Sequence, residues 1–129
     1  YLFAQNVENL NSGFYHYNIN KRGLEFLRSC TNTKFFKSLF HQDDPSLDQA
    51  NFAIFLTAIP HRTTEKYGTL GHNLIMIECG QLCQSFWLIA SAMNLKVCPH
   101  SLINESLFFQ TLNINSHQEI LLYCLVFGK

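Results

Sequence analysis

Residues 61–94 decide the fold of this chain, and they read HRTTEKYGTLGHNLIMIECGQLCQSFWLIASAMN. From His72 to Met93 apolar residues recur at helical spacing, and further apolar residues widen and back this stripe. The stripe itself consists of Ile75, Cys79, Leu82, Phe86, Ile89 and Met93. The pattern predicts a helix of ~33 Å, at 1.5 Å per residue, that is buried on several sides. We expect the rest of the chain to pack around it.

The segment ahead of this helix carries the residues with the most evident chemistry. Lys66 and Tyr67 are adjacent, and they precede Gly68 and Gly71 in what we expect to be a tight turn. An amine and a phenol can each take part in proton transfer, so the pair is a candidate catalytic site. The alternative is a solvated, charged connection, and the spacing alone favours that alternative.

Further motifs lie on both sides of the pair. The helix carries LIMIECG at 74–80 followed by Gln84-Ser85, and the next strand ends near Cys98-Pro99. Upstream stand GFYHYN at 13–18 and LEFL at 24–27, and the chain closes on FGK. Together with Lys66-Tyr67, these motifs resemble, in the same order, those of SagB-type dehydrogenases, which are azoline oxidases of the FMN-dependent nitroreductase superfamily. The resemblance covers nearly the whole chain.

The resemblance implies an FMN-dependent dehydrogenase that oxidises thiazoline or oxazoline rings to thiazoles or oxazoles in a ribosomally made peptide. Lys66 and Tyr67 match the family positions that handle the proton while hydride passes to the flavin. Lys129 matches a basic residue that pairs with the FMN phosphate, and Pro99 and His100 occupy the turn that approaches the flavin ring. The resemblance also implies a homodimer and a possible cyclodehydratase partner.

The expected elements form a single α+β domain over residues 1–129, with a nitroreductase-like, mixed or antiparallel sheet around the long buried central helix. The strand at 52–59 is almost continuously apolar, so we expect it to be central and covered on both faces. Thr33 is the expected cap of a short helix, and Pro99 is expected to end a strand. The other expected elements are strands at 2–7, 14–17, 24–27, 95–98 and 119–127, and helices at 33–40 and 103–110. The family places flavin-binding sequence ahead of the matched region, so we expect this domain to be the C-terminal portion of a longer chain.

Composition narrows the possible functions. The 129 residues are 47% hydrophobic, and 9 basic residues balance 9 acidic ones, so no long-range field favours nucleic acid or an anionic membrane. Glu78, Gln81 and Gln84 within the long helix argue against a membrane span. The 5 cysteines include no CxxC, so we expect neither disulfides nor a metal site and place the protein in the cytoplasm.

An aromatic cluster and an acidic pair could each form a binding site, but a structural role is favoured for both. Tyr15, His16 and Tyr17 could stack on a ligand, but cross-strand support of the sheet is the favoured interpretation. Asp43 and Asp44 could serve acid–base chemistry or bind a cation, but a solvated loop before a proline is favoured. The sequence contains no GxGxxG, GxxxxGKS, HExxH or GxSxG motif.

Two other functions remain open. One is another flavin oxidoreductase of the same fold, such as a nitro- or quinone-reductase that uses NAD(P)H; the Lys66-Tyr67 pair favours the azoline oxidase over it. The other is a non-catalytic subunit that keeps the fold and has lost flavin binding. The turn at 98–102, which has no glycine where the family often has one, favours this last alternative.

Overall fold

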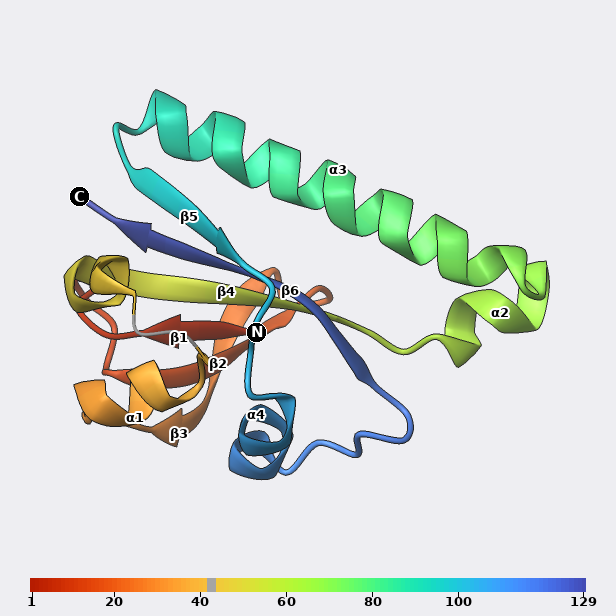
Figure 1. The fold of residues 1–129 in the computed structure, drawn as a ribbon, viewed down its shortest axis with the longest axis horizontal. Coiled ribbons are helices and arrows are strands. Elements are labelled where there is room, and N and C mark those ends of the chain that lie inside the picture. Colours follow the sequence, from red (N-terminus) through yellow and green to blue (C-terminus); the bar gives the residue numbers. More distant parts are fainter. Residues whose placement is uncertain (42–43) are drawn as a thin grey trace.

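The computed structural model describes residues 1–41 and 44–129. Within them, six strands form one antiparallel sheet in the order β3-β2-β1-β4-β6-β5 (Figure 1). The strands are β1 (Leu2–Ala4), β2 (Gly13–Asn18), β3 (Gly23–Ser29), β4 (Ala50–Ala58), β5 (Lys96–His100) and β6 (Ile120–Gly128). The helices are α1 (Thr33–Ser38), the 3₁₀ turn η1 (Pro45–Gln49), α2 (His61–Tyr67), α3 (Leu70–Ala92) and α4 (Glu105–Leu112).

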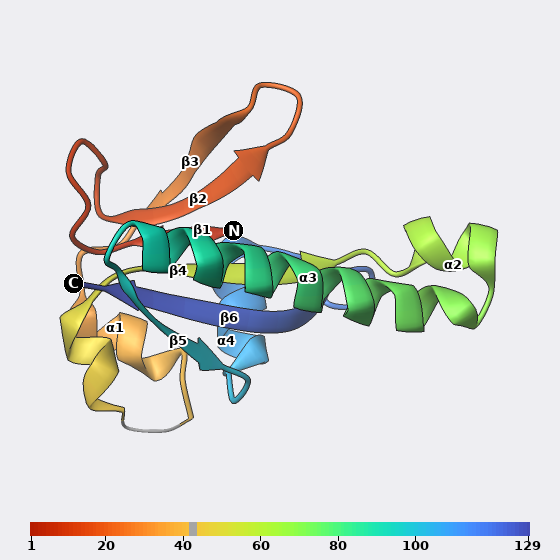
Figure 2. The same cartoon turned by 90° about the horizontal axis from the view of Figure 1, so that it is seen from above.

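The first three strands form the predicted antiparallel meander. β1 pairs with β2, and β2 pairs with β3, which places Tyr15 opposite Phe26. The two rings meet edge to face with centroids 5.2 Å apart, and the Tyr15 hydroxyl donates to the carbonyl of Asn11. Tyr15 therefore supports the sheet, as favoured from the sequence, whereas Tyr17 lies exposed on the outer part of the hairpin. In Figure 2 this hairpin extends away from the rest of the sheet.

Strand β4 lies between β1 and β6, so the prediction of a central strand is confirmed. Its side chains alternate between two apolar clusters, because successive residues of a strand point to opposite faces of the sheet. Ala53 and Phe55 belong to one cluster, and Phe52, Ile54 and Leu56 belong to the other. Both faces of β4 are thus covered.

One face of the sheet is covered by α1, η1 and α4, which supply the larger cluster (Figures 1 and 2). The fully buried rings here include Phe3, Phe14, Phe36, Phe55 and Phe108. The cap of α1 is Asn32, whose side chain accepts from the backbone N–H of Lys34, so the predicted cap at Thr33 is wrong by one residue. The packing of aromatic rings between helices and sheet provides the main core of the domain.

The opposite face of the sheet is covered by α3 alone among the helices that the structure describes (Figure 2). Cys83 and Ala90 pack on Leu125 and Phe127 of β6, and most other apolar side chains of α3 remain exposed. The predicted long central helix is therefore present, but its predicted burial on several sides is wrong within this chain. The reason is that a single sheet covers only one side of a helix, and among the other described elements only α2 packs on α3 elsewhere, at its first turn.

Two local predictions also differ from the structure. The segment 61–67, expected to be a turn, forms the helix α2. Pro99, expected to end a strand, lies inside β5 opposite Leu125. β5 is an edge strand that pairs only with β6 among the described strands, so one of its edges has no ladder bond for proline to remove.

By length and composition alone, α3 could cross a membrane. The mean hydropathy of its most apolar window of 18 residues is 1.3, and 22% of that window is buried. However, α3 carries Glu78, Gln81 and Gln84 and lies against the sheet through Cys83 and Ala90. These features indicate that the exposed apolar face of α3 contacts protein rather than lipid.

Candidate functional site

Lys66 and Tyr67 form the last residues of α2, at the corner where the chain enters α3. The Lys66 ammonium lies 5.0 Å from the centroid of the Tyr67 ring, a cation–π arrangement. Gly68 ends the helix with φ +57°, and its N–H donates to the carbonyl of Thr64 at 2.8 Å. Both Lys66 and Tyr67 are exposed in this chain, with Tyr67 46% exposed.

The corner depends on close packing of α2 against α3. A Cβ atom on Gly71 would lie 2.9 Å from the Cα of Thr64, which is closer than real contacts allow. Glycine is needed here because the backbones of the two helices approach each other directly. The predicted tight path through Gly68 and Gly71 is confirmed, although it joins two helices rather than forming a loop.

Replacing Gly71 by alanine is expected to lower the free energy of unfolding by about 1–3 kcal/mol, the usual range for an overpacked site. Chemical denaturation measures this change. Gly23→Ala is the matched control, because its Cβ would meet nothing closer than 3.8 Å; its stability should change by less than about 0.5 kcal/mol. Equal stabilities of the two variants would contradict the close packing of α2 on α3.

Two cavities lie beside this corner. One, of about 530 Å³, is lined by the start of α2 and by the segment ahead of β6, including His61 and His117. The other, of about 200 Å³, lies between α3 and the end of β4. Arg62 lines both cavities, whereas neither Lys66 nor Tyr67 lines either of them. The basic residue that the chain itself presents to these cavities is thus Arg62.

The residues expected to contact the cofactor lie on or beside β5. Lys129 and Lys96 line the same cavity of about 100 Å³. His100, at the other end of β5, has a side chain only 10% exposed. Burial lowers the pKa of His100 below 6.5, while the nearby carboxylate of Asp44 opposes this shift. The imidazole is therefore held in its neutral form around pH 7.

The predicted catalytic pair, Lys66 and Tyr67, lies apart from the predicted cofactor-binding residues within one chain. The pairing of β5 with β6 places Lys129 near Lys96, and places His100 opposite Cys124. In Figure 1, α2 lies at one end of α3, and the C-terminus with Lys129 lies toward the other end. Lys66 and Tyr67 are thus remote from Lys129 along the length of α3.

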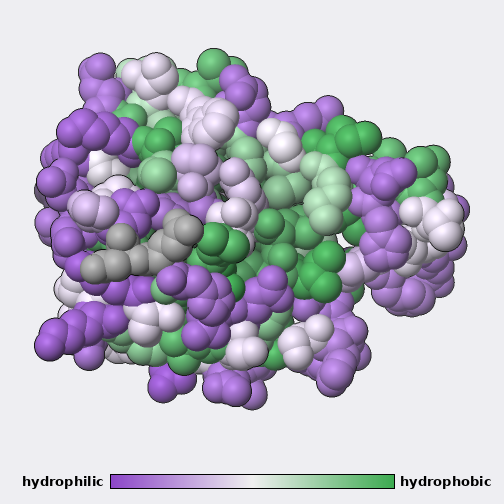
Figure 3. Space-filling view, viewed as in Figure 1, coloured by the Kyte–Doolittle hydropathy of each residue, from purple (hydrophilic) through white to green (hydrophobic). Residues whose placement is uncertain are grey.

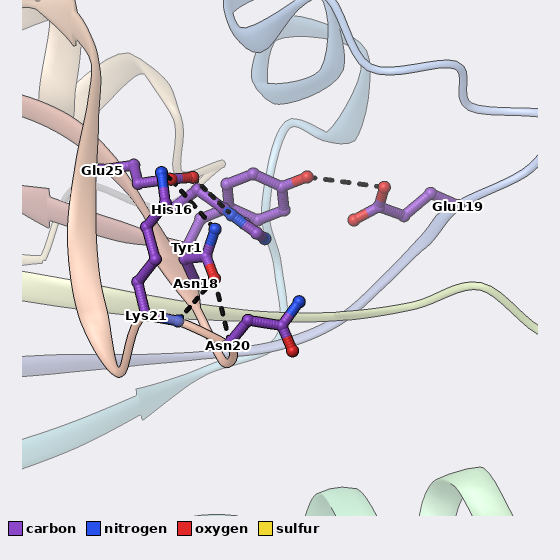
Figure 4. Close-up of polar contacts among 7 residues, drawn as sticks. All are labelled: Tyr1, His16, Asn18, Asn20, Lys21, Glu25 and Glu119. Atoms are coloured by element: carbon purple, nitrogen blue, oxygen red, sulfur yellow. Dashed lines mark hydrogen bonds and ion pairs between the residues drawn. The ribbon is translucent and has the colours of Figure 1, made fainter.

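A polar network that the sequence did not reveal lies at the start of the chain (Figure 4). The Tyr1 hydroxyl donates to Glu119 at 3.5 Å, and the Thr57 hydroxyl donates to the same carboxylate at 2.6 Å. Burial first, and Glu119 second, raise the pKa of the Tyr1 phenol to about 12. Such a phenol stays protonated, so this network ties β1, β4 and β6 together as a structural link.

The adjoining hairpin carries a second set of polar contacts. Glu25 accepts from Lys21 at 2.8 Å and from Asn18 at 2.9 Å, and His16 lies 3.9 Å away (Figure 4). The His16 ring packs on Tyr1 with centroids 5.2 Å apart. These contacts fix the hairpin, which agrees with the structural role favoured for His16.

The structure describes all five cysteines and one residue of the acidic pair, Asp44. All five cysteines are free thiols, as expected. Burial raises the pKa of Cys79 to about 11, which supports its interpretation as a protonated, apolar side chain. Asp44 caps η1 by accepting from the N–H of Ser46 at 2.8 Å. Asp43, its expected neighbour in a solvated loop, lies outside the described residues.

Comparison with known proteins identifies the family to which the chain is similar. A model of the Nitroreductase family matches residues 4–129. The microcin B17-processing protein McbC of Escherichia coli is 26% identical over 127 residues, which cover 97% of this chain and 47% of that protein. The chain thus spans about half the length of this curated relative.

Solved structures show the same fold. The E. coli microcin synthetase McbBCD complex with truncated pro-MccB17 bound contains a chain that matches with a TM-score of 0.85 and 23% identity, over 99% of this chain and 50% of that chain. A putative nitroreductase from Anabaena variabilis also matches with a TM-score of 0.85, at 19% identity, over 98% of this chain and 26% of that chain. The α+β architecture expected from the sequence is confirmed.

Proposed function

The chain belongs to the Nitroreductase family, and from this premise we propose that it forms part of an FMN-dependent dehydrogenase that oxidises thiazoline or oxazoline rings in a ribosomally made peptide. The resemblance to SagB-type dehydrogenases is confirmed by the family match and the similarity to McbC. The observation that carries the proposal is the similarity over 97% of this chain to a protein that processes microcin B17. That similarity supports a peptide substrate, and the proposed ring chemistry rests on the resemblance of the motifs to SagB-type dehydrogenases.

The reaction removes a proton and a hydride from the azoline ring. FMN, when bound, would supply the hydride acceptor. We assign the proton-handling step to Lys66 and Tyr67, whose cation–π contact holds the amine beside the phenol. A substrate ring placed against this corner would meet both groups, because both are exposed there.

We assign the phosphate end of FMN to the cavity beside β5. Lys129 and Lys96 line this cavity together, and two ammonium groups suit a phosphate dianion. The cavity of about 100 Å³ is too small for the whole cofactor, so the flavin ring would extend beyond it toward Pro99 and His100. We propose that the site is completed by the surface of a second subunit.

The second subunit is proposed to pack on α3. Several apolar side chains of α3 are more than half exposed, including Ile77 at 55% and Leu88 at 63%. Figure 3 shows hydrophobic surface over the middle of the molecule and along the side where α3 lies. Apolar surface of this extent is typical of protein interfaces. A homodimer through α3 would also bring α2 of one subunit toward surfaces of the other.

Flavin content tests the proposal directly. The purified full-length protein is expected to show the yellow flavin absorbance and to release FMN on denaturation. Lys129→Ala should weaken FMN binding by roughly 10-fold or more, because a hydrogen bond to a charged group contributes about 1.5–3 kcal/mol. A colourless protein that does not take up added FMN would instead support the non-catalytic subunit.

The remaining alternatives make different predictions. A nitro- or quinone-reductase would bind FMN and oxidise NAD(P)H, but would leave azoline peptides unchanged. We favour the azoline oxidase because McbC, whose name gives microcin B17 processing, covers nearly all of this chain. By the same analogy, we propose a cyclodehydratase partner that forms the azoline rings. The free cysteines support a cytoplasmic location.

A further inference from the structure

Three side chains with metal-binding atoms converge where η1 meets the edge strand β5. They are the carboxylate of Asp44, the thiol of Cys98 and the imidazole of His100. Their ligand atoms all lie within 4.8 Å of one another. Asp44 is far from the other two in sequence, so the cluster exists only in the folded chain.

The His100 ring shows an unsatisfied atom at this place. Its Nε2 is buried and has no hydrogen-bond partner, and the whole side chain is 10% exposed. A buried polar atom without a partner costs free energy unless a ligand satisfies it. The Oδ2 atom of Asp44 lies 3.7 Å from this nitrogen, which is too long for a hydrogen bond. The Phe40 ring packs edge-on against the imidazole, with the two ring centroids 5.0 Å apart, and limits the movement of the imidazole.

The carboxylate is also held in place. Its Oδ1 accepts from the N–H of Ser46 at 2.8 Å, so Oδ2 is the oxygen turned toward His100. The cluster therefore brings an imidazole nitrogen, a carboxylate oxygen and a thiol sulfur close to one point.

The distances match a zinc site better than a hydrogen-bonded group. With zinc bonds of about 2.0–2.3 Å, neighbouring ligand atoms of a tetrahedral site stand roughly 3.3–3.8 Å apart. The His100 nitrogen and the Asp44 oxygen lie 3.7 Å apart, a few tenths of an ångström more than the roughly 3.3–3.5 Å that Zn–N and Zn–O bonds require, so a small shift brings both onto one ion. The sulfur of Cys98 lies within 4.8 Å of both atoms, so a movement of at most about 1 Å completes the set.

We propose that Asp44, Cys98 and His100 bind one divalent zinc ion. The combination of thiolate, imidazole and carboxylate favours Zn²⁺ or Co²⁺ over Mg²⁺ or Ca²⁺, which prefer oxygen ligands. Three protein ligands leave a fourth position for water. The ion ties η1 to β5 and thereby fixes the edge of the sheet that carries Pro99 and His100. The sequence did not reveal this site, because no CxxC or HExxH spacing marks it.

Cobalt provides the test, because a thiolate ligand on Co²⁺ gives a sulfur-to-metal charge-transfer absorption. We expect the metal-free full-length protein to bind Co²⁺ with this absorption and to lose it when Zn²⁺ is added. Cys98→Ser should abolish the absorption, and His100→Gln should weaken metal affinity by at least roughly 10-fold. Zn²⁺ should raise the melting temperature of the parent protein and not that of Cys98→Ser.

The controls separate this site from other thiols and from misfolding. Cys79→Ser removes a different half-buried thiol and should keep the absorption. Circular dichroism of the metal-free variants should match that of the parent. Lys129→Ala, which tests the FMN phosphate contact, should also keep the absorption, because Lys129 supplies none of the three metal ligands. A parent protein without the absorption, or a Cys98→Ser variant that retains it, would overturn the proposal.

Discussion

Replacing Lys66 by alanine is expected to lower kcat for azoline oxidation by about 10²–10⁴-fold, the usual contribution of a positioned acid–base group. The amine is held at the end of α2 over the Tyr67 ring, so its removal takes away the proposed proton acceptor without opening the core. Turnover is measured by the loss of two mass units from an azoline peptide, with FMN in excess.

Tyr67→Phe removes the hydroxyl of Tyr67 and keeps its aromatic ring, so it tests the two parts of the side chain separately. Phenylalanine keeps the aromatic face under the Lys66 ammonium, so any loss of turnover in this variant reports on the hydroxyl. Lys34→Ala is the matched control, because Lys34 is an exposed lysine of α1 on the other face of the sheet. Turnover at the parent rate in both Lys66→Ala and Tyr67→Phe would exclude the proposed proton-handling role.

The paired substitution Ile77→Lys/Leu88→Lys is expected to break the proposed dimer. The two residues stand eleven positions apart, which is close to three helical turns, so they share one face of α3. Both are more than half exposed in the single chain, at 55% and 63%, so lysine should not disturb the monomer fold. In a dimer through this face, the charges would be buried, and the dimer Kd should rise by at least roughly 100-fold.

Analytical ultracentrifugation over a range of concentrations measures this shift, and FMN titration measures its effect on the shared site. Ile19→Lys is the control, because it places the same charge on an exposed isoleucine of the β2–β3 turn, away from α3. A paired variant that remains dimeric at parent affinity would show that α3 is not the interface. Circular dichroism distinguishes loss of the dimer from loss of the fold.

Much of the fold could be predicted because strands and helices repeat their apolar residues at different periods. The apolar run in β4 predicted a central strand, and Ala53 and Leu56 now lie in opposite clusters on its two faces. The meander of β1 to β3 followed from short apolar strands separated by turn residues. Local errors occurred at Pro99 and Thr33, where a single residue type was given more weight than its place in the sheet or helix.

The candidate site was less predictable. Lys66 and Tyr67 were identified as neighbours, and the structure adds that α2 positions them at an exposed corner. Lys129 was identified by resemblance alone, and its shared cavity with Lys96 arises from the pairing of β5 with β6. The contact of Thr57 with Glu119 had no signal in the sequence, because it joins distant parts of the chain.

The sequence by itself determined the helix α3, the apolar strands β4 and β6, and the order of motifs that identifies the family, since all of these are properties of neighbouring residues. Only the tertiary structure decided that α3 is covered on one side, that α2 is a helix, and that Asp44 meets Cys98 and His100. The physical reason is that burial and distance depend on which remote segments pack together. Periodicity records which faces are apolar, but the packing of the sheet decides which of those faces are buried.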